Sequence, residues 1–279
     1  MKEGVTSTVP GPAVPLKGLA KAGFLTEFLR DTFALADVEV LKLRRDPLEL
    51  LTRAIQPALW LLMFGEVFGK LRAVPTGGLD YLTFMVPGIL AQSVLFIAIF
   101  YGISVIWERD LGIVQKLLVS PAPRTALVFG KAISAGVRGL SQAIVIYLLA
   151  TLLGVRMRFG IDLLGVLLFV ILGSAIFSTF SLAIACLVRT RERFMGIGQV
   201  LTMPLFFGSN AIYPLVIMPG WLRTFAKLNP LSYEVDALRA LMVQGGQSMF
   251  GVGFDFWVLA LVLVAWVLIT AKLYPNVIR

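Results

Sequence analysis

The stretch LLGVLLFVILGSAIFSTFSLAIACLV, residues 163–188, has no charged side chain. It is longer than the roughly 20 apolar residues that a helix needs to cross the hydrocarbon of a membrane. The rest of the chain has the same character, because 58% of its 279 residues are hydrophobic, 15% are charged and the mean hydropathy is +0.88. Soluble domains do not have this composition. The sequence therefore predicts an all-α integral membrane protein with one membrane domain.

Working outward from this stretch, five more segments are long and apolar enough to span a membrane. The six predicted transmembrane helices lie near 50–68, 81–107, 127–153, 163–188, 196–218 and 254–274. A β-barrel would show short segments of alternating polarity instead. An even number of spans places both termini on the same side of the membrane.

The distribution of basic residues predicts which side that is. Most of the 25 Lys and Arg residues fall in the segments that share a side with the termini. Because positively charged loops stay in the cytoplasm, we expect a multi-pass protein of the cell (inner) membrane with cytoplasmic termini. The net charge of +9 then fits contact with anionic membrane lipids and requires no nucleic acid.

The N-terminal region predicts two further segments. Residues 1–22 are rich in Pro, Gly and small polar residues, which is typical of a flexible cytoplasmic tail. In 24–45 apolar residues recur at helical spacing, which predicts an amphipathic helix in the cytoplasmic interface. Packing of this helix on its own bundle is an equally acceptable interpretation. The transmembrane domain then occupies 23–279.

Several kinds of chemistry are excluded by missing residues. The chain has no His, which removes His-based acid–base catalysis and most zinc sites. Its single Cys186 cannot form an internal disulfide, and no G-x-x-x-x-G-K-[ST] phosphate loop occurs. We therefore expect a non-enzymatic subunit that binds no cofactor or metal of its own.

Polar residues within the predicted spans are candidates for a solute pathway, although hydrogen bonds between helices explain them equally well. Arg138 lies about halfway along its span and needs a partner or a wet cavity, whereas Glu66 lies near an edge where water can reach it. The other candidates are Gln92, Gln142, Gln199 and Asn210.

Residues 108–131, ERDLGIVQKLLVSPAPRTALVFGK, connect the second and third predicted spans. Within 108–119, apolar and polar residues separate onto two helical faces, which predicts a short helix on the cytoplasmic surface. The SPAP sequence at 120–123 then ends it. Such a helix is suited to receive a push from a soluble partner, although the membrane surface could also cover its apolar face.

The same residues resemble the E-R-[ED]-x-G…L…SP…GK segment of ABC-2 type permeases, the membrane subunits of a class of ATP-binding-cassette exporters. Residues 206–242, FFGSNAIYPLVIMPGWLRTFAKLNPLSYEVDALRALM, resemble the second signature of that family. The two motifs occur in the family's order, and the resemblance covers nearly the whole chain after the tail.

The resemblance implies roles for individual residues. The first motif implies a coupling helix that docks on an ATP-binding subunit, and the amphipathic segment would be the family's interface helix. The implied coupling residues are Glu108, Arg109, Asp110, Gly112, Leu117, Ser120 and Pro121, where Asp110 replaces the family's usual Glu. The second motif implies short outer helices before the last span, and its key residues are Asn229, Pro230, Tyr233 and Arg239.

The resemblance also implies a mechanism and partners. Two copies of the chain, or one copy and a related chain, would form a dimer around the pathway, and separate ATPase subunits would bind ATP and Mg²⁺. The drug and antibiotic exporters are the most similar branch, which implies a hydrophobic or amphipathic substrate. The alternatives are export of a lipid or a lipid-linked polysaccharide, an ion- or proton-driven carrier and a lipid-modifying enzyme. The last two alternatives are disfavoured, because the predicted spans contain neither paired carboxylates nor a metal-ligand cluster.

Overall fold

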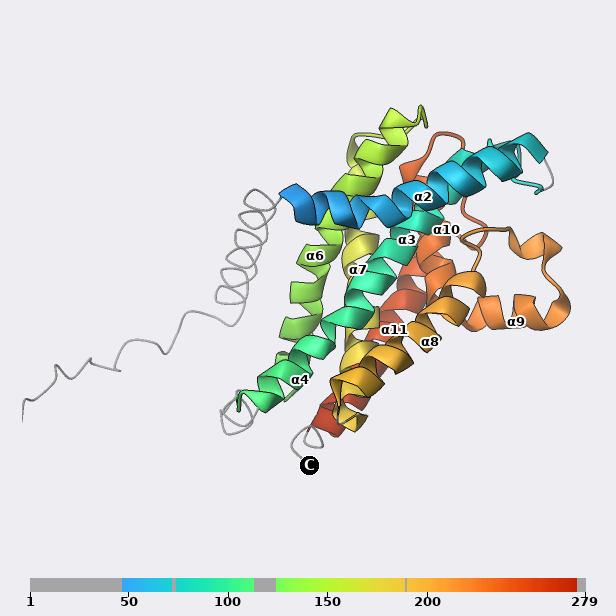
Figure 1. Cartoon of the computed structure of the whole chain (residues 1–279). Helices are drawn as coiled ribbons and strands as arrows, with labels where there is room; N and C mark the ends of the chain where they lie inside the picture. The colour runs from blue at the N-terminus through green and yellow to red at the C-terminus, as the bar shows by residue number, and fades with distance from the viewer. Residues whose placement is uncertain (1–46, 72–73, 113–123, 189, 275–279) are drawn as a thin grey trace, which may run out of the picture.

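The computed structural model describes residues 47–71, 74–112, 124–188 and 190–274 (Figure 1). The expected tail and interface helix lie outside these residues. The helices are α2 (Pro47–Leu71), α3 (Tyr81–Tyr101), α4 (Ile103–Asp110), α6 (Arg124–Leu152), α7 (Ile161–Leu187), α8 (Arg191–Phe207), the 3₁₀ helix η1 (Leu215–Ile217), α9 (Gly220–Leu228), α10 (Pro230–Met242) and α11 (Val252–Leu273). The described chain has no β-strand, in agreement with the all-α prediction.

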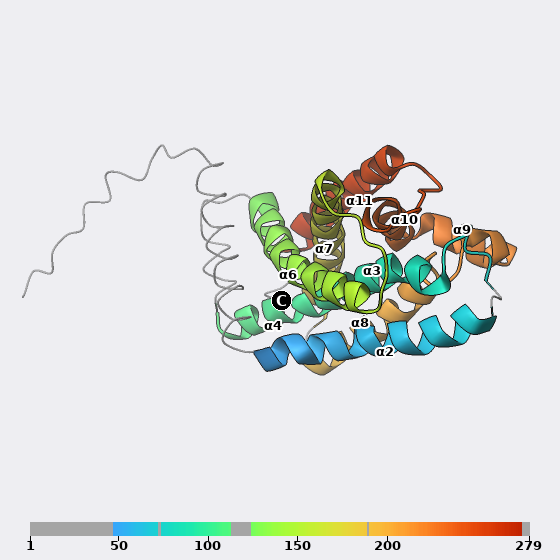
Figure 2. The same cartoon turned by 90° about the horizontal axis from the view of Figure 1, so that it is seen from above.

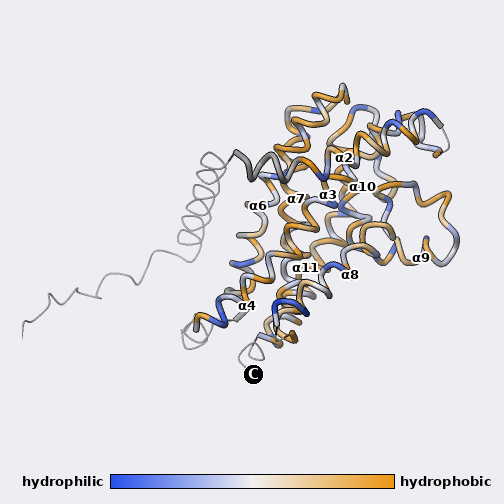
Figure 3. The backbone as a smooth tube through the Cα atoms, in the orientation of Figure 1, coloured by the Kyte–Doolittle hydropathy of each residue, from blue (hydrophilic) through white to orange (hydrophobic). Residues whose placement is uncertain are grey.

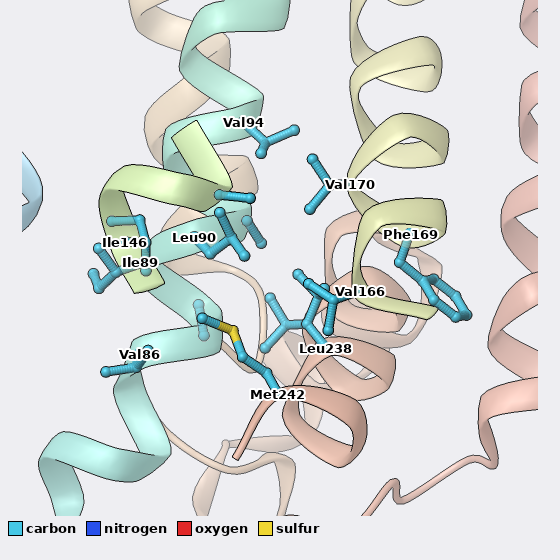
Figure 4. Close-up of a cluster of buried hydrophobic side chains, with 14 of the residues drawn as sticks. Val86, Ile89, Leu90, Val94, Ile146, Val166, Phe169, Val170, Leu238 and Met242 are labelled. Carbon is cyan, nitrogen blue, oxygen red and sulfur yellow. The ribbon is translucent and has the colours of Figure 1, made fainter. Parts of the chain in front are cut away.

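Helix α7 lies at the centre of the bundle, where it packs against α6, α11, α3 and α10. Seen from above, α2 and α11 lie on opposite sides of this group (Figure 2). The buried core joins α3 to α7 and α10 (Figure 4). In that core Val86 and Leu90 come from α3, Val166 from α7, and Leu238 and Met242 from α10. The short helix α10 is therefore an internal element of the bundle.

Within the described part of the chain, four helical segments are long and apolar enough to cross a membrane, and hydrophobic residues run along their length (Figure 3). They are Tyr81–Asp110, which combines α3 and α4, Lys131–Leu152 in α6, Ile161–Leu187 in α7 and Val252–Leu273 in α11. Helix α2 covers the first predicted span, at 50–68. The total of six spans stays a prediction.

The fifth predicted span, at 196–218, is wrong as a single helix. Helix α8 ends at Phe207, and residues 208–214 form an irregular segment before η1. The last-turn carbonyls of α8 are bonded from outside the helix: the Asn229 side-chain amide donates to the Leu205 carbonyl at 2.7 Å, and Ser209 Oγ donates to the Phe206 carbonyl at 2.7 Å. These bonds satisfy a helix end that otherwise needs another turn or water.

Candidate functional site

Glu108, Arg109 and Asp110 form the last turn of α4, at the opposite end of the α3–α4 run from the start of α3 (Figure 1). The sequence pattern of 108–119 predicts these three residues in the same helix as the residues that follow them. That prediction is wrong, because α4 ends at Asp110, Leu111 is its C-cap, and the next residue, Gly112, has φ of 72°. This left-handed backbone conformation is accessible to glycine and strained for other residues.

The Glu108 carboxylate pairs with Lys131 on α6. The Lys131 ammonium donates to both carboxylate oxygens and lies 2.7 Å from Oε1. The two side chains are only 27% and 15% exposed. Partial burial strengthens this charge-assisted contact, and the exposed part of each side chain stays hydrated.

The other two charges of this turn contact α8 and the end of α7. Asp110 accepts a hydrogen bond from the Arg191 guanidinium at 2.7 Å. The same guanidinium lies 3.7 Å from the ring centre of Trp107, which is a cation–π distance. Arg109 donates to Asp110 and, at 3.4 Å, to the carbonyl of Val188 directly after α7.

We call this group the α4 clasp. It consists of Trp107, Glu108, Arg109 and Asp110 on α4, with Lys131, Val188 and Arg191 as their partners. One helical turn is thereby bonded to α6, to the end of α7 and to the start of α8. A displacement of this turn must move those helices with it or break the bonds. This is the property that transmission of a mechanical signal requires.

Three predicted coupling residues, Leu117, Ser120 and Pro121, lie outside the described part of the chain. The docking of the 108–121 segment on an ATPase therefore stays a prediction. Glu108, Arg109 and Asp110 instead bond to other helices of the same chain. The sequence did not predict these contacts.

The second motif builds the start of α10. The Asn229 side chain caps the helix by accepting from the backbone N–H of Leu231 at 3.0 Å, and Pro230 occupies the first turn. This combination is a standard start for a helix. The Tyr233 hydroxyl donates to the Lys227 carbonyl at 2.6 Å, which ties α10 to the end of α9.

Arg239 fastens the other half of α10. Its guanidinium donates to the Asn210 carbonyl at 2.8 Å and to the Phe84 carbonyl at 3.4 Å, and lies 3.9 Å from the centre of the Phe84 ring. Burial lowers the pKa of Arg239 to about 10, against the opposing effect of Asp236, so the side chain remains charged at neutral pH. One buried cation therefore joins α3, the segment after α8 and α10.

Three buried carboxyl groups in or near this motif were not predicted from the sequence: Glu234, Asp236 and Asp255. Asp236 accepts from Ser248 Oγ at 2.6 Å and from the backbone N–H groups of Met249 and Phe250. Ser248 Oγ also lies 3.3 Å from Asp255 at the start of α11. Glu234 and Asp236 lie on α10, outside the predicted spans, and Asp255 lies at the start of α11, at the edge of the last predicted span.

The other predicted polar residues do not converge on one site. The Arg138 guanidinium lies 4.9 Å from the centre of the Tyr101 ring, Gln199 is exposed, and Gln92 and Gln142 are buried. Asn210 is brought next to Arg239 through its backbone carbonyl. Glu66 forms a surface ion pair with Lys70 at 2.9 Å, as expected for a solvated residue.

Three known permeases show clear similarity to this chain. The putative transport permease ycf38 of Cyanophora paradoxa is 32% identical over 216 residues, which are 77% of this chain and 74% of the relative. The daunorubicin resistance ABC transporter permease protein DrrB1 of Streptomyces coeruleorubidus is 28% identical over 231 residues, or 82% and 81%. The probable multidrug ABC transporter permease YbhR of Escherichia coli K12 is 29% identical over 169 residues, or 60% and 45%.

The family model for the ABC-2 type transporter matches residues 30–243. This range contains both the α4 clasp and α10, the two regions in which the motif residues make their contacts. The resemblance inferred from the two motifs is therefore confirmed. The chain belongs to the ABC-2 type transporter family, the membrane permeases of ABC transporters.

Proposed function

We propose that this chain forms the substrate pathway of an ABC exporter for hydrophobic or amphipathic drugs, and that a separate subunit binds ATP and Mg²⁺ and hydrolyses the nucleotide. Family membership supports the transport role. The names of the relatives DrrB1 and YbhR, which refer to daunorubicin resistance and multidrug transport, support the substrate class. The working unit in the inner membrane is a dimer of two copies, or of one copy and a related chain.

The observation that carries the coupling part of this proposal is the α4 clasp. A push on the segment after Gly112 reaches the end of α4 first, and the Glu108–Lys131 pair passes it to α6. The Asp110–Arg191 bond passes it to α8. In this mechanism the three charged motif residues transmit the movement, and residues 113–121 make the docking contact.

The test is purification of the chain with its ATPase from native membranes, followed by measurement of drug-stimulated ATP hydrolysis. We expect Glu108→Lys to reduce the drug stimulation roughly tenfold, because the pair with Lys131 is lost. A tenfold reduction corresponds to about 1.4 kcal/mol of lost coupling. Exchange of the two charges, Glu108→Lys with Lys131→Glu, should recover most of it because the pair is restored in reverse. Co-purification of the ATPase should be unchanged in both variants.

Glu66→Lys is the matched control, because it makes the same charge change at an exposed pair. It should leave drug stimulation unchanged. If Glu108→Lys releases the ATPase from the complex, Glu108 is a docking residue and transmission through the clasp is wrong. If the chain is purified without any ATPase and its transport stops when the proton gradient is removed, the ion-driven carrier replaces the exporter.

A lipid or lipid-linked polysaccharide is the alternative substrate. Hydrolysis by the wild-type complex in nanodiscs, measured with daunorubicin and then with extracted membrane lipids, separates the two. The proposal requires stronger stimulation by the drug.

A further inference from the structure

Glu234 has the most unusual environment of the described ionisable residues. It lies in the middle of α10 and has no solvent-exposed surface. Neither of its carboxylate oxygens has a hydrogen-bond partner within the described part of the chain. A buried carboxylate normally accepts several hydrogen bonds or pairs with a cation, because an isolated buried charge costs several kcal/mol.

The carboxyl group lies directly on the backbone of α7. A Cβ atom at Gly173 would overlap the carboxyl carbon and both oxygens of Glu234. Any side chain larger than that of glycine would therefore push α10 away from α7 at this point. The carboxyl group therefore contacts the α7 backbone at Gly173, where there is no side chain.

Charged neighbours do not explain the position either. The titratable residues of the helices packed against α10 are Tyr81 and Tyr101 on α3, Asp162 and Cys186 on α7, Arg223 and Lys227 on α9, and Asp255 and Lys272 on α11. Helix α10 itself adds Tyr233, Asp236 and Arg239. Arg239, the buried cation on α10, donates its two hydrogen bonds to the carbonyls of Phe84 and Asn210.

Protonation resolves this conflict. A neutral carboxyl group carries no charge to solvate, and its O–H becomes a donor where the carboxylate had only acceptors. Burial raises the pKa of Glu234 well above its ordinary value, with no contribution from a neighbouring charge.

We propose that Glu234 is a proton-binding site, and that the bound proton latches α10 onto α7 at Gly173. The proton comes from water and returns to water, and no other bond changes. When α10 separates from α7, water reaches the carboxyl group and the proton leaves. When α10 packs again, the proton must be taken up. This latch operates whatever solute the protein carries.

The sign of the pH dependence follows from the raised pKa. The contribution of Glu234 to the packed state is complete at a pH below its ordinary pKa and is lost as the pH rises toward the raised value. Alkaline conditions therefore favour separation of α10 from α7, and acidic conditions favour the latched state.

The direct test is infrared spectroscopy of the purified protein at neutral pH, with Glu234→Gln as the reference. The wild type should show the carbonyl band of a protonated carboxyl group, and the difference spectrum should assign it to Glu234. Glu66→Gln, which removes an exposed carboxylate, should leave this band in place. Absence of the band from the wild type would overturn the proposal without affecting the assignment as an exporter.

Thermal unfolding in detergent supplies the second measurement. Between about pH 5 and pH 8 the melting temperature of the wild type should fall by about 3 °C or more relative to Glu234→Gln, whose side chain cannot ionise. Glu234→Met replaces Glu234→Gln if the latter does not fold. Equal pH profiles for the wild type and the variant would contradict the latch.

Gly173→Ala tests the geometry. Its Cβ should force the carboxyl group off α7 and remove the infrared band. Gly196→Ala is the control, since no heavy atom lies within 4 Å of a Cβ added there. If the band is unchanged in Gly173→Ala, proton binding does not depend on the contact between α10 and α7, and the latch is wrong.

Discussion

The α4 clasp and α10 both carry the charged residues of a family motif, but the two regions hold them differently. In the clasp, Glu108 and Asp110 pair with basic side chains of other helices and keep part of their surface in water. On α10, Glu234, Asp236 and Arg239 are buried, and their partners are backbone groups, a hydroxyl or, for Glu234, none within the described residues.

This difference has a physical consequence. Partly hydrated ion pairs can break and form again at a low cost, because water replaces a lost partner. Buried charges have no such replacement, so they hold one arrangement until the whole segment moves. We therefore expect the clasp to be adjustable during a transport cycle and α10 to behave as a rigid unit.

The largest expected effect tests the rigid half of this comparison. Arg239→Leu should lower the free energy of unfolding by about 3–5 kcal/mol, because two backbone carbonyls lose their donor and Asp236 loses a nearby cation. Unfolding in mixed micelles with increasing denaturing detergent measures the change. Arg158→Leu is the control, since Arg158 and Asp162 form a pair at 3.7 Å whose side chains are each 36% exposed, and this pair should contribute about 0.5 kcal/mol or less. Equal losses in the two variants would remove the distinction between buried and hydrated charges.

A smaller effect is expected at the start of α10. Asn229→Ala removes both the helix cap and the bond to the Leu205 carbonyl, and should cost about 2 kcal/mol. Asn229→Asp keeps an oxygen for the cap but loses the amide donor, so its cost should be about 1 kcal/mol. The same unfolding titration compares them. If Asn229→Asp is as stable as the wild type, the bond between α8 and α10 contributes nothing, and α10 is less firmly held than we propose.

The sequence was sufficient to predict the family and the apolar helices α3, α6, α7 and α11. Each of these contains a long apolar run, and such a run has few stable alternatives to a helix inside a membrane. The end of α8 was not predictable in this way. Residues 208–218 are almost as apolar as a helix interior, and the Leu205 carbonyl in the last turn of α8 is bonded by Asn229, which lies further along the chain.

The buried ionisable residues of α10 were not predictable for a related reason. In PLSYEVDALRALM, Glu234 and Asp236 lie on either side of Val235, so the helix has no clean polar face. Such a pattern normally indicates a surface helix with some exposed charge. Only the packing of α3, α7 and α11 around α10 buries most of its residues, including Glu234 and Asp236. The glycine at 173 gives no signal until the structure places Glu234 against it.

The smallest expected effect tests the adjustable half of the comparison. In a double-mutant cycle of Trp107→Ala and Arg191→Gln, the coupling energy between the two side chains should be about 0.5–1 kcal/mol, the usual range for a cation–π contact open to water. Trp107 is half exposed, so water can solvate the guanidinium when the ring is removed. The unfolding titration measures the cycle. A coupling energy above about 2 kcal/mol is typical of a desolvated contact. That result would mean that the clasp is held as firmly as α10, and an adjustable joint at the end of α4 would then be excluded.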